Sequence, residues 1–291
     1  MDSNMVGHLT PEGAAGVRPV FGVTMTAMNN PVLIDEDGPV RLLTLNDPER
    51  ANPLSWELVI ALTEALRSAA DAPEVRAVIL TGAGRHFSAG ADLSALQQVA
   101  TGSHSDSLRR DSESLRELFE VLLGHPKLTI AAVHGAAIGG GCGLATACDL
   151  VVAEPSSVFA YTEVTIGYVP ALVLTFLTRR VAGQVARRLL LDPERISGER
   201  AMELGLVDHL VDAGNALDRA HDLAVSMARK GSPAAIATTK KLLNETVGIG
   251  WREALAHAAE VNASHRLHPE CKRGVKTFLE EKRTPDWLEE E

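Results

Sequence analysis

The chain has 291 residues and a formal net charge of −10, and its composition is 45% hydrophobic and 23% charged. These values are ordinary for a globular protein with a substantial core, arranged as one large domain or two smaller ones. The acidic balance argues against a surface that binds nucleic acid or an anionic membrane. The three cysteines lack CxxC spacing, so we expect reduced thiols and a cytoplasmic location.

The N-terminal 28 residues have scattered Gly and Pro, with no basic segment followed by a continuous apolar one. We therefore expect a flexible N-terminal tail over 1–28, without a signal peptide or membrane span. Residues 29–214 are expected to form the core, and 215–291 a C-terminal helical region that serves as lid or oligomer contact. The last region has helical periodicity throughout, with helices expected over 215–230, 232–246, 250–265 and 269–282.

The core region repeats one pattern four times, in which two extended segments precede a helix. Strands that are buried between helical crossovers predict an α/β fold. Small polar residues at 100–107 predict a mobile loop, and a helix is expected over 108–123. The expected segments of the four units are 32–36, 41–45 and helix 55–70; 75–80, 87–88 and a helix after 92; 128–133, 136–138 and helix 140–148; and 150–153, 158–161 and helix 171–191.

Two glycine-rich junctions, at residues 87–92 (FSAGAD) and 138–143 (IGGGCG), follow apolar runs that are typical of buried strands. Glycine lets the backbone turn sharply and lets a ligand approach the main chain closely. A helix N-terminus also offers unpaired N–H groups and partial positive charge. Two such turns predict two main-chain donors aimed at one developing negative charge, which is an oxyanion hole.

These junctions, together with residues 45–54 (LNDPERANPL) and 201–207 (AMELGLV), resemble the crotonase, or enoyl-CoA hydratase/isomerase, superfamily. The motifs occur in the family's order between about residues 32 and 287. The resemblance implies a crotonase-like spiral of ββα units with a C-terminal helical layer. It also implies an acyl-CoA thioester substrate, a homotrimer or a hexamer built as a dimer of trimers, and neither a metal nor a cofactor beyond the coenzyme A of the substrate.

Carried over by position, the resemblance makes the amides of Ala91 and Gly140 the oxyanion donors and Glu163 the catalytic carboxylate. Partial burial should raise the pKa of this carboxylate through desolvation. The same resemblance gives further candidates for binding the substrate or its CoA, which are Arg50, Ala51, Ala89, Gly90, Asp92, Leu93, Gly139, Gly143, Phe278 and Lys282.

Gly143 departs from the hydratases of this family, in which a first glutamate stands at this position and a second at that of Glu163. Because glycine cannot hold water or move a proton, three hypotheses stay open. Glu163 alone shuttles protons, as an isomerase requires; a substrate carboxylate or another side chain positions water; or the protein binds acyl-CoA without turnover. Gly143 either makes room in the pocket or allows close helix packing, and Cys142 and Cys148 are expected to be small core residues.

We expect a hydro-lyase that adds water to a 2-enoyl-CoA. The GGGxG junction and the Val-Pro-Ala at 169–171 resemble hydratases of the methylglutaconyl-CoA and carboxygeranoyl-CoA type, which favours a branched or substituted acyl group. Residues 141–146 approach the dinucleotide pattern GxGxxG, but Thr146 replaces the third glycine and we reject that interpretation. The arginines at 179, 180, 187 and 188 could contact RNA, but at this net charge a solvated face or subunit contact is favoured.

Overall fold

The computed structural model describes residues 30–92, 97, 99–102 and 105–289, so the expected tail at 1–28 lies outside the described residues. The strands are β1 (Val32–Asp37), β2 (Val40–Leu45), β3 (Pro53–Leu54), β4 (Ala77–Gly82), β5 (Gly90–Ala91), β6 (Leu128–Val133), β7 (Ala136–Ile138), β8 (Leu150–Ala153), β9 (Val158–Ala160), β10 (Ile196–Ser197) and β11 (His209–Leu210).

Most helices lie near their predicted positions, whereas the helix Gly198–Glu203 was not among the expected elements. The helices are α1 (Trp56–Asp71), α3 (Ser105–Leu123), α4 (Gly140–Ala147), α5 (Ala171–Arg180), α6 (Gly183–Leu191), α7 (Gly198–Glu203), α8 (Ala216–Lys230), α9 (Pro233–Glu245), α10 (Trp251–His265) and α11 (Pro269–Glu281), with short 3-10 helices η1 (Pro48–Arg50) and η2 (Glu163–Ile166).

The main sheet has six strands in the order β1-β2-β4-β6-β8-β11. Strands β1 and β2 are antiparallel, and every other neighbouring pair is parallel. Side chains alternate between the two faces along a strand, so Val78 and Leu80 of β4 join one core cluster while Ala77 and Ile79 join another. The sheet is therefore buried on both faces, as expected for parallel strands between helical layers.

Two smaller sheets, β10-β9-β7 and β3-β5, complete a spiral. Each turn sends one strand into the main sheet and the next strand into a smaller one: β6 leads to β7 and α4, and β8 leads to β9 and α5. This arrangement confirms the predicted α/β fold of ββα units.

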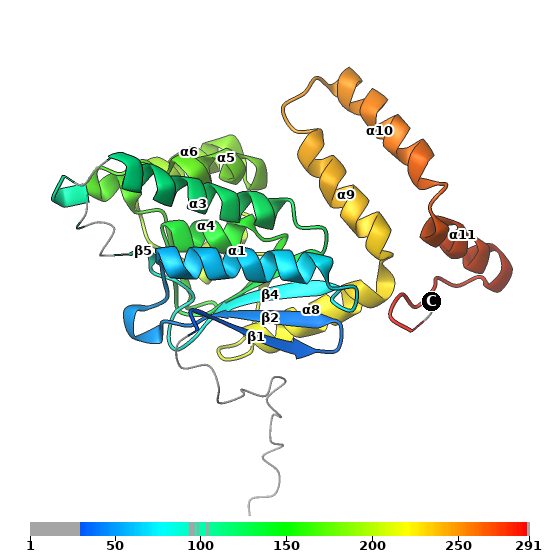
Figure 1. The fold of residues 1–291 in the computed structure, drawn as a ribbon, viewed down its shortest axis with the longest axis horizontal. Coiled ribbons are helices and arrows are strands. Elements are labelled where there is room, and N and C mark those ends of the chain that lie inside the picture. Colours follow the sequence, from blue (N-terminus) through cyan, green and yellow to red (C-terminus); the bar gives the residue numbers. More distant parts are fainter. Residues whose placement is uncertain (1–29, 93–96, 98, 103–104, 290–291) are drawn as a thin grey trace, which may run out of the picture.

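The two faces of the main sheet have different covers (Figure 1). Helices α1, α3 and α4 lie over one face, and α8 packs against the other through Ala216, Ala220 and Ala224. The expected boundary at residue 215 grouped α8 with the C-terminal helices, whereas the structure places α8 on the sheet. The separate helical part begins at residue 232, and residues 232–289 are called the C-terminal arm below.

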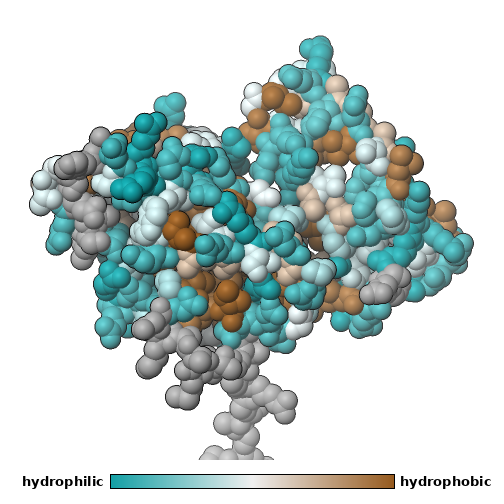
Figure 2. All heavy atoms as spheres, in the orientation of Figure 1, coloured by the Kyte–Doolittle hydropathy of each residue, from teal (hydrophilic) through white to brown (hydrophobic). Residues whose placement is uncertain are grey.

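Helices α9 to α11 of the arm project away from the sheet, and Figure 2 shows hydrophobic residues on their surface. Neither α9 nor α10 contains a buried residue, and α11 contains one, Thr277. Large apolar side chains on the arm are exposed instead: Leu243, Val247, Ile249, Trp251, Leu255, Leu267, Val275, Phe278 and Leu279.

Two expected elements differ in their bounds. The helix predicted over 171–191 is divided into α5 and α6, because Val181 and Ala182 have extended backbone angles and the Val181 side chain is buried. The helix predicted from 108 begins at Ser105, so residues 105–107 are helical rather than loop, and 103–104 lie outside the described residues. None of the described helices is long and apolar enough to cross a membrane.

Candidate active site

The first glycine junction is held against the second one. Gly90 has a φ of +84°, which favours glycine, and a Cβ there would lie 2.3 Å from the Ile138 carbonyl oxygen and 3.2 Å from the Gly140 nitrogen. Ala89 N–H donates to the Ala51 carbonyl at 2.7 Å. A side chain at Gly90 would therefore force apart the two main-chain segments that the sequence predicted to meet.

Ala91 is the last residue of β5, where it pairs in parallel with Leu54 of β3. It is exposed, so its main chain lies at the surface of the junction rather than inside the core. The buried residues before it are Phe87, Ser88 and Gly90. The accessible residues of this junction are thus Ala89 and Ala91, because Asp92 is buried as well.

The second junction forms the start of α4. Gly139, with a φ of +53°, donates its N–H to the Ala160 carbonyl at 2.7 Å and places Gly140 as the first helical residue. Gly139, the residue before the helix, has no side chain to cap this N-terminus. Because the N–H groups of a first helical turn have no partner within the helix and carry the positive end of the helix dipole, the amide of Gly140 is suited to bind an oxyanion.

Glu163 lies beside this helix start. It begins η2, and its Oε1 is 3.5 Å from where a Cβ on Gly139 would lie. Its Oε2 is buried and has no hydrogen-bond partner among the described residues. Burial raises the pKa of the Glu163 carboxyl above its ordinary value, which confirms the expected direction. A carboxylate with a raised pKa is suited to take and return protons near neutral pH.

Side chains of α3 and α5 pack against Gly143, the position at which hydratases of the resembled family have a first glutamate. A Cβ on Gly143 would lie 2.6 Å from Cγ2 of Val173 in α5 and 3.4 Å from Cζ of Phe119 in α3. Gly143 therefore permits close approach of α5, and the expected extra room in the pocket is occupied by Val173. The neighbouring Cys142 and Cys148 are buried, with burial raising the pKa of each thiol to about 12, as expected of core residues.

Arg50 forms ion pairs with two carboxylates. Its guanidinium contacts Asp47 at 2.5 Å and Asp92 at 2.9 Å, and the Asp92 side chain is only 3% exposed. The ion pair with Asp92 links the loop after β2 to the residue that follows Ala91. Contact between Arg50 and CoA stays a prediction, and Leu93 lies outside the described residues.

Phe278 and Lys282 are not brought to the other candidates. Phe278 is an exposed residue of α11 and Lys282 caps the end of that helix. Figure 1 shows α11 and β5 at opposite ends of the long axis of the molecule. Within one chain of this conformation, the arm does not supply these residues to the site.

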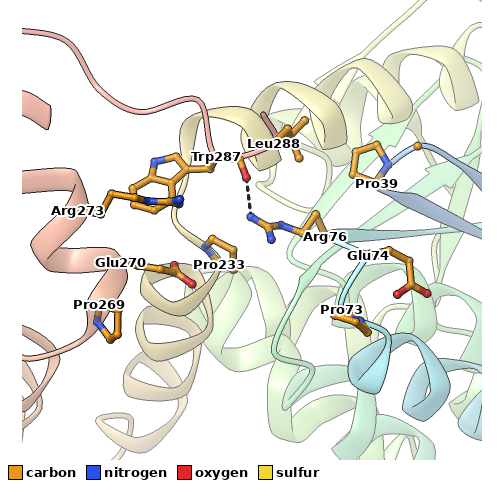
Figure 3. Close-up of a pocket in the computed structure, with 11 residues that line it drawn as sticks. Pro39, Pro73, Glu74, Arg76, Pro233, Pro269, Glu270, Arg273, Trp287 and Leu288 are labelled. Carbon is orange, nitrogen blue, oxygen red and sulfur yellow. Dashed lines mark hydrogen bonds between the residues drawn. The ribbon is translucent and has the colours of Figure 1, made fainter. Parts of the chain in front are cut away.

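A cavity of about 770 Å³ opens between the arm and the core, away from both junctions. In Figure 3 the Arg76 Nη2 atom donates to the carbonyl of Trp287 at 2.9 Å, and Arg273 lies over the indole ring of Trp287. None of the predicted site residues that the structure describes lines this cavity. Among the described residues there is also no group of three or more His, Cys, Asp or Glu that could hold a metal ion.

Sequence reasoning assigned no role to Asn52 and Ser88, although both lie in the quoted motifs. Both are completely buried and hydrogen-bonded at the base of the first junction. Buried polar groups in folded proteins are nearly always hydrogen-bonded, and these two side chains follow that rule. In the sequence Asn52 stands between Ala51 and Pro53. The sequence alone does not show which groups its side chain binds, so its role could not be predicted.

The fold and this geometry define an α/β spiral enzyme with two touching glycine junctions and one half-buried carboxylate. A family model described as enoyl-CoA hydratase/isomerase matches residues 35–290. The chain is 44% identical to a Thermus thermophilus protein assigned as an enoyl-CoA hydratase, over 86% of this chain and 98% of that protein. It is 32% identical to the 2,3-dehydroadipyl-CoA hydratase of Escherichia coli, over 88% and 98%.

A solved structure agrees with these relatives. The enoyl-CoA hydratase of Polaromonas sp. JS666 superimposes with a TM-score of 0.81 at 36% identity, covering 87% of this chain and 98% of that one. The chain belongs to the enoyl-CoA hydratase/isomerase family, and it is an enzyme of that family.

Proposed function

We propose that this enzyme adds water across the double bond of a 2-enoyl-CoA, with Ala91 and Gly140 as oxyanion donors and Glu163 as the proton carrier. The close approach of Gly90 to the start of α4, where a Cβ on Gly90 would lie only 3.2 Å from the Gly140 nitrogen, is the observation that carries this proposal. It needs no cofactor beyond the coenzyme A of the substrate.

In this mechanism the thioester oxygen accepts from the N–H groups of Ala91 and Gly140. These bonds strengthen as negative charge moves onto the oxygen in the enolate. The ionised Glu163 takes a proton from water while the water oxygen bonds to C3, and the same carboxyl then returns that proton to C2. One carboxylate thereby completes the addition of one water molecule.

Apolar side chains around Glu163 support an acyl chain as the ligand. Val164, Ile166, Tyr168 and Val169 are all exposed on the segment that follows the carboxylate. The Val-Pro-Ala at 169–171 remains the basis for proposing a branched or substituted acyl group. A panel of linear, branched and carboxylated enoyl-CoA esters, compared by kcat/KM, tests this specificity.

The packing of Gly143 favours a second candidate, an enoyl-CoA isomerase. Because Val173 occupies the place of a second carboxylate, Glu163 is the single proton carrier that an isomerase needs. It would remove a proton from C2 of a 3-enoyl-CoA and deliver it to C4, which moves the double bond into conjugation with the thioester.

Loss or gain of the absorbance of the conjugated thioester separates these reactions. We expect a 2-enoyl-CoA to lose its absorbance with the wild type, and Glu163→Gln to lower kcat by about 100-fold or more, the range of general acid–base catalysis. Glu199→Gln, an exposed glutamate of α7, is the matched control. Turnover of only a 3-enoyl-CoA would establish the isomerase.

A protein that binds CoA esters without turnover is the alternative from another class. Binding of a 2-enoyl-CoA and a 3-enoyl-CoA, measured by calorimetry, with no change in either absorbance would establish it. Unchanged turnover of the Glu163→Gln variant would remove Glu163 from the mechanism.

We further propose that the enzyme forms a homotrimer, or a hexamer of two trimers, through the C-terminal arm. Exposed apolar side chains on three successive helices support a second copy as the partner that covers them. Since Phe278 and Lys282 lie away from Ala91 in their own chain, contact with CoA requires either movement of the arm or the site of a neighbouring subunit.

Light scattering coupled to size exclusion tests this assembly. We expect the wild type to elute as a trimer or hexamer, and Leu279→Glu to shift it toward smaller species. Lys276→Glu, an exposed position on the same helix, controls for the added negative charge. A monomeric wild type at the concentrations used for activity would contradict the proposal.

A further inference from the structure

Asn52 is completely buried beneath the first glycine junction, and its side chain binds only main chain. Its Oδ1 accepts from the Asp47 N–H at 2.8 Å, and its Nδ2 donates to the carbonyls of Ala83 and His86 at 2.9 and 2.8 Å. The Phe87 carbonyl lies 3.3 Å from the same nitrogen. The amide therefore uses its oxygen on the loop after β2 and both N–H bonds on the loop that leads into the junction.

The main chain of Ala51 and Asn52 is hydrogen-bonded to residues 88–90 of the junction, directly or through the Ser88 hydroxyl. The Ala51 carbonyl accepts from Ala89 N–H at 2.7 Å, and the Asn52 carbonyl accepts from Ser88 Oγ at 2.7 Å. Ser88 Oγ in turn accepts from Gly90 N–H at 3.2 Å. Every residue from Phe87 to Gly90 is thus tied to the Ala51–Asn52 segment, directly or through one hydroxyl.

Ser88 extends this network to the second junction. Its main chain donates to the Ala136 carbonyl and accepts from Ile138 N–H, both at 3.0 Å. A Cβ on Gly141 would lie 2.6 Å from Ser88 Oγ, so the start of α4 rests on this side chain. The segments before Ala91 and around Gly140 therefore share one support.

We propose that Asn52 is a positioning residue that sets the separation and direction of the two oxyanion N–H groups, its side chain by fixing the loop at 83–87 and its main-chain carbonyl by holding Ser88. This inference rests on the proposed function, because it assigns a role toward the thioester oxygen that Ala91 and Gly140 would hold. Asn52 does not touch the substrate. Its effect is on geometry, to which oxyanion stabilisation is sensitive.

The backbone at this position also explains the choice of residue. Ala51 and Asn52 have φ values of +60° and +53°, a region that Asn and Gly adopt more readily than other residues. Asp would keep the shape of the side chain, but a carboxylate cannot donate to the carbonyls of Ala83 and His86. Asn thus combines a tolerated backbone conformation with the required two donors and one acceptor.

The test measures kcat and KM for a 2-enoyl-CoA with Asn52→Gly, Asn52→Asp and Ser88→Ala. We expect kcat to fall by about 10- to 100-fold for the Asn52 variants and by less for Ser88→Ala, in keeping with the sensitivity of catalysis to misplacement near 1 Å. KM should change by no more than about threefold, because the donors gain strength mainly in the transition state.

A second readout follows the bound thioester itself. Each variant is made in a Glu163→Gln background, so that the ester stays unreacted, and its isotope-labelled carbonyl stretch is recorded by infrared difference spectroscopy. Hydrogen bonds to the oxygen lower this frequency. We expect a low frequency with Asn52 present and a shift toward the free ester in Asn52→Gly.

Thr63→Val is the matched control for lost stability, because Thr63 is a buried α1 residue whose hydroxyl bonds to the Val59 carbonyl. It should lower the melting temperature and leave the carbonyl frequency unchanged. If Asn52→Gly does not fold, Ser88→Ala decides. Wild-type kcat and frequency in the folded variants would overturn the inference, whereas a wild type with neither turnover nor a shifted carbonyl would instead overturn the proposed function.

Discussion

The junction that carries Ala91 and the segment that carries Glu163 both lie beside the start of α4, and the chain supports them very differently. The first rests on buried side chains and on the hydrogen bonds of Asn52 and Ser88. The second begins a 3-10 helix with no buried residue, and no side chain caps it. The proposed donors thus lie on a support of buried side chains and hydrogen bonds, whereas the segment of the carboxylate is held mainly by its own main chain.

This difference agrees with the chemistry proposed for each side. Oxyanion donors stabilise a transition state best when they need no rearrangement. A carboxylate that takes a proton from water and returns it to carbon must reach both atoms, so a less constrained segment suits it. Four experiments separate the two kinds of support, and they follow from the largest expected effect to the smallest.

Gly141→Ala should have the largest effect of the four, and it acts on the support beneath the proposed oxyanion donors. The new Cβ would lie 2.6 Å from Ser88 Oγ and 2.7 Å from its carbonyl oxygen, so α4 must shift relative to the first junction. We expect a loss of about 1–3 kcal/mol in unfolding free energy and a fall in kcat of about 100-fold. Gly183→Ala at the start of α6, where nothing lies within 4 Å, should leave both unchanged. Wild-type kcat in Gly141→Ala would show that this spacing does not matter.

Gly143→Ala tests the packing on the side of the carboxylate. Its Cβ would meet Val173 Cγ2 at 2.6 Å, which should destabilise the fold by about 1–3 kcal/mol in urea unfolding. Val173→Ala removes the methyl that the new Cβ would meet, so the double variant Gly143→Ala/Val173→Ala should recover part of the lost stability. We expect kcat to fall less than in Gly141→Ala. A neutral single variant, or no coupling in the double variant, would contradict the close packing.

Arg50→Ala asks whether this residue orders the junction or binds CoA. Loss of the ion pair with the buried Asp92 should lower kcat by up to about tenfold, while the affinity for free CoA, measured by calorimetry, stays within about twofold. Arg187→Ala, an exposed arginine of α6, controls for the loss of charge. A fall confined to CoA affinity would instead support the predicted phosphate contact.

The pH dependence of Glu163→Gln should give the smallest effect on stability. Because the folded-state pKa of Glu163 is raised by burial, its ionisation opposes folding as pH rises above the ordinary glutamate value of about 4.3. The Gln variant should therefore melt slightly higher than the wild type at pH 7, and the two should converge near pH 4. For the wild type, kcat/KM should fall as pH drops through the raised pKa. A Gln variant that is less stable at pH 7 would contradict a carboxylate whose ionised form is destabilised by burial.

Much of the fold could be predicted from the sequence, because buried strands and amphipathic helices leave clear periodicities. Ser55 stands directly before α1 and its hydroxyl accepts from Leu58 N–H at 3.3 Å, as is typical of a serine at a helix start. The break between α5 and α6 was missed, since Val181 fits a helical pattern and its extended conformation follows from tertiary packing. The placement of α8 was missed for a similar reason, because a helix whose buried residues are all alanines does not reveal which surface it covers.

The candidate site was predictable where glycine is required and not where partners are distant. Gly90 and Gly139 adopt positive φ values, as the sharp turns implied. The role of Gly143 could not be decided, because Val173 lies thirty residues further along the chain. The bonds of Asn52 to Ala83 and His86 likewise join segments whose approach depends on the completed spiral.

The most direct measurement is a crystal structure with an unreactive acyl-CoA thioester bound. The account predicts that the thioester oxygen lies within about 2.7–3.2 Å of both the Ala91 and Gly140 nitrogens, the range of ordinary hydrogen bonds. A thioester oxygen that contacts only one of these two nitrogens, or neither, would contradict it.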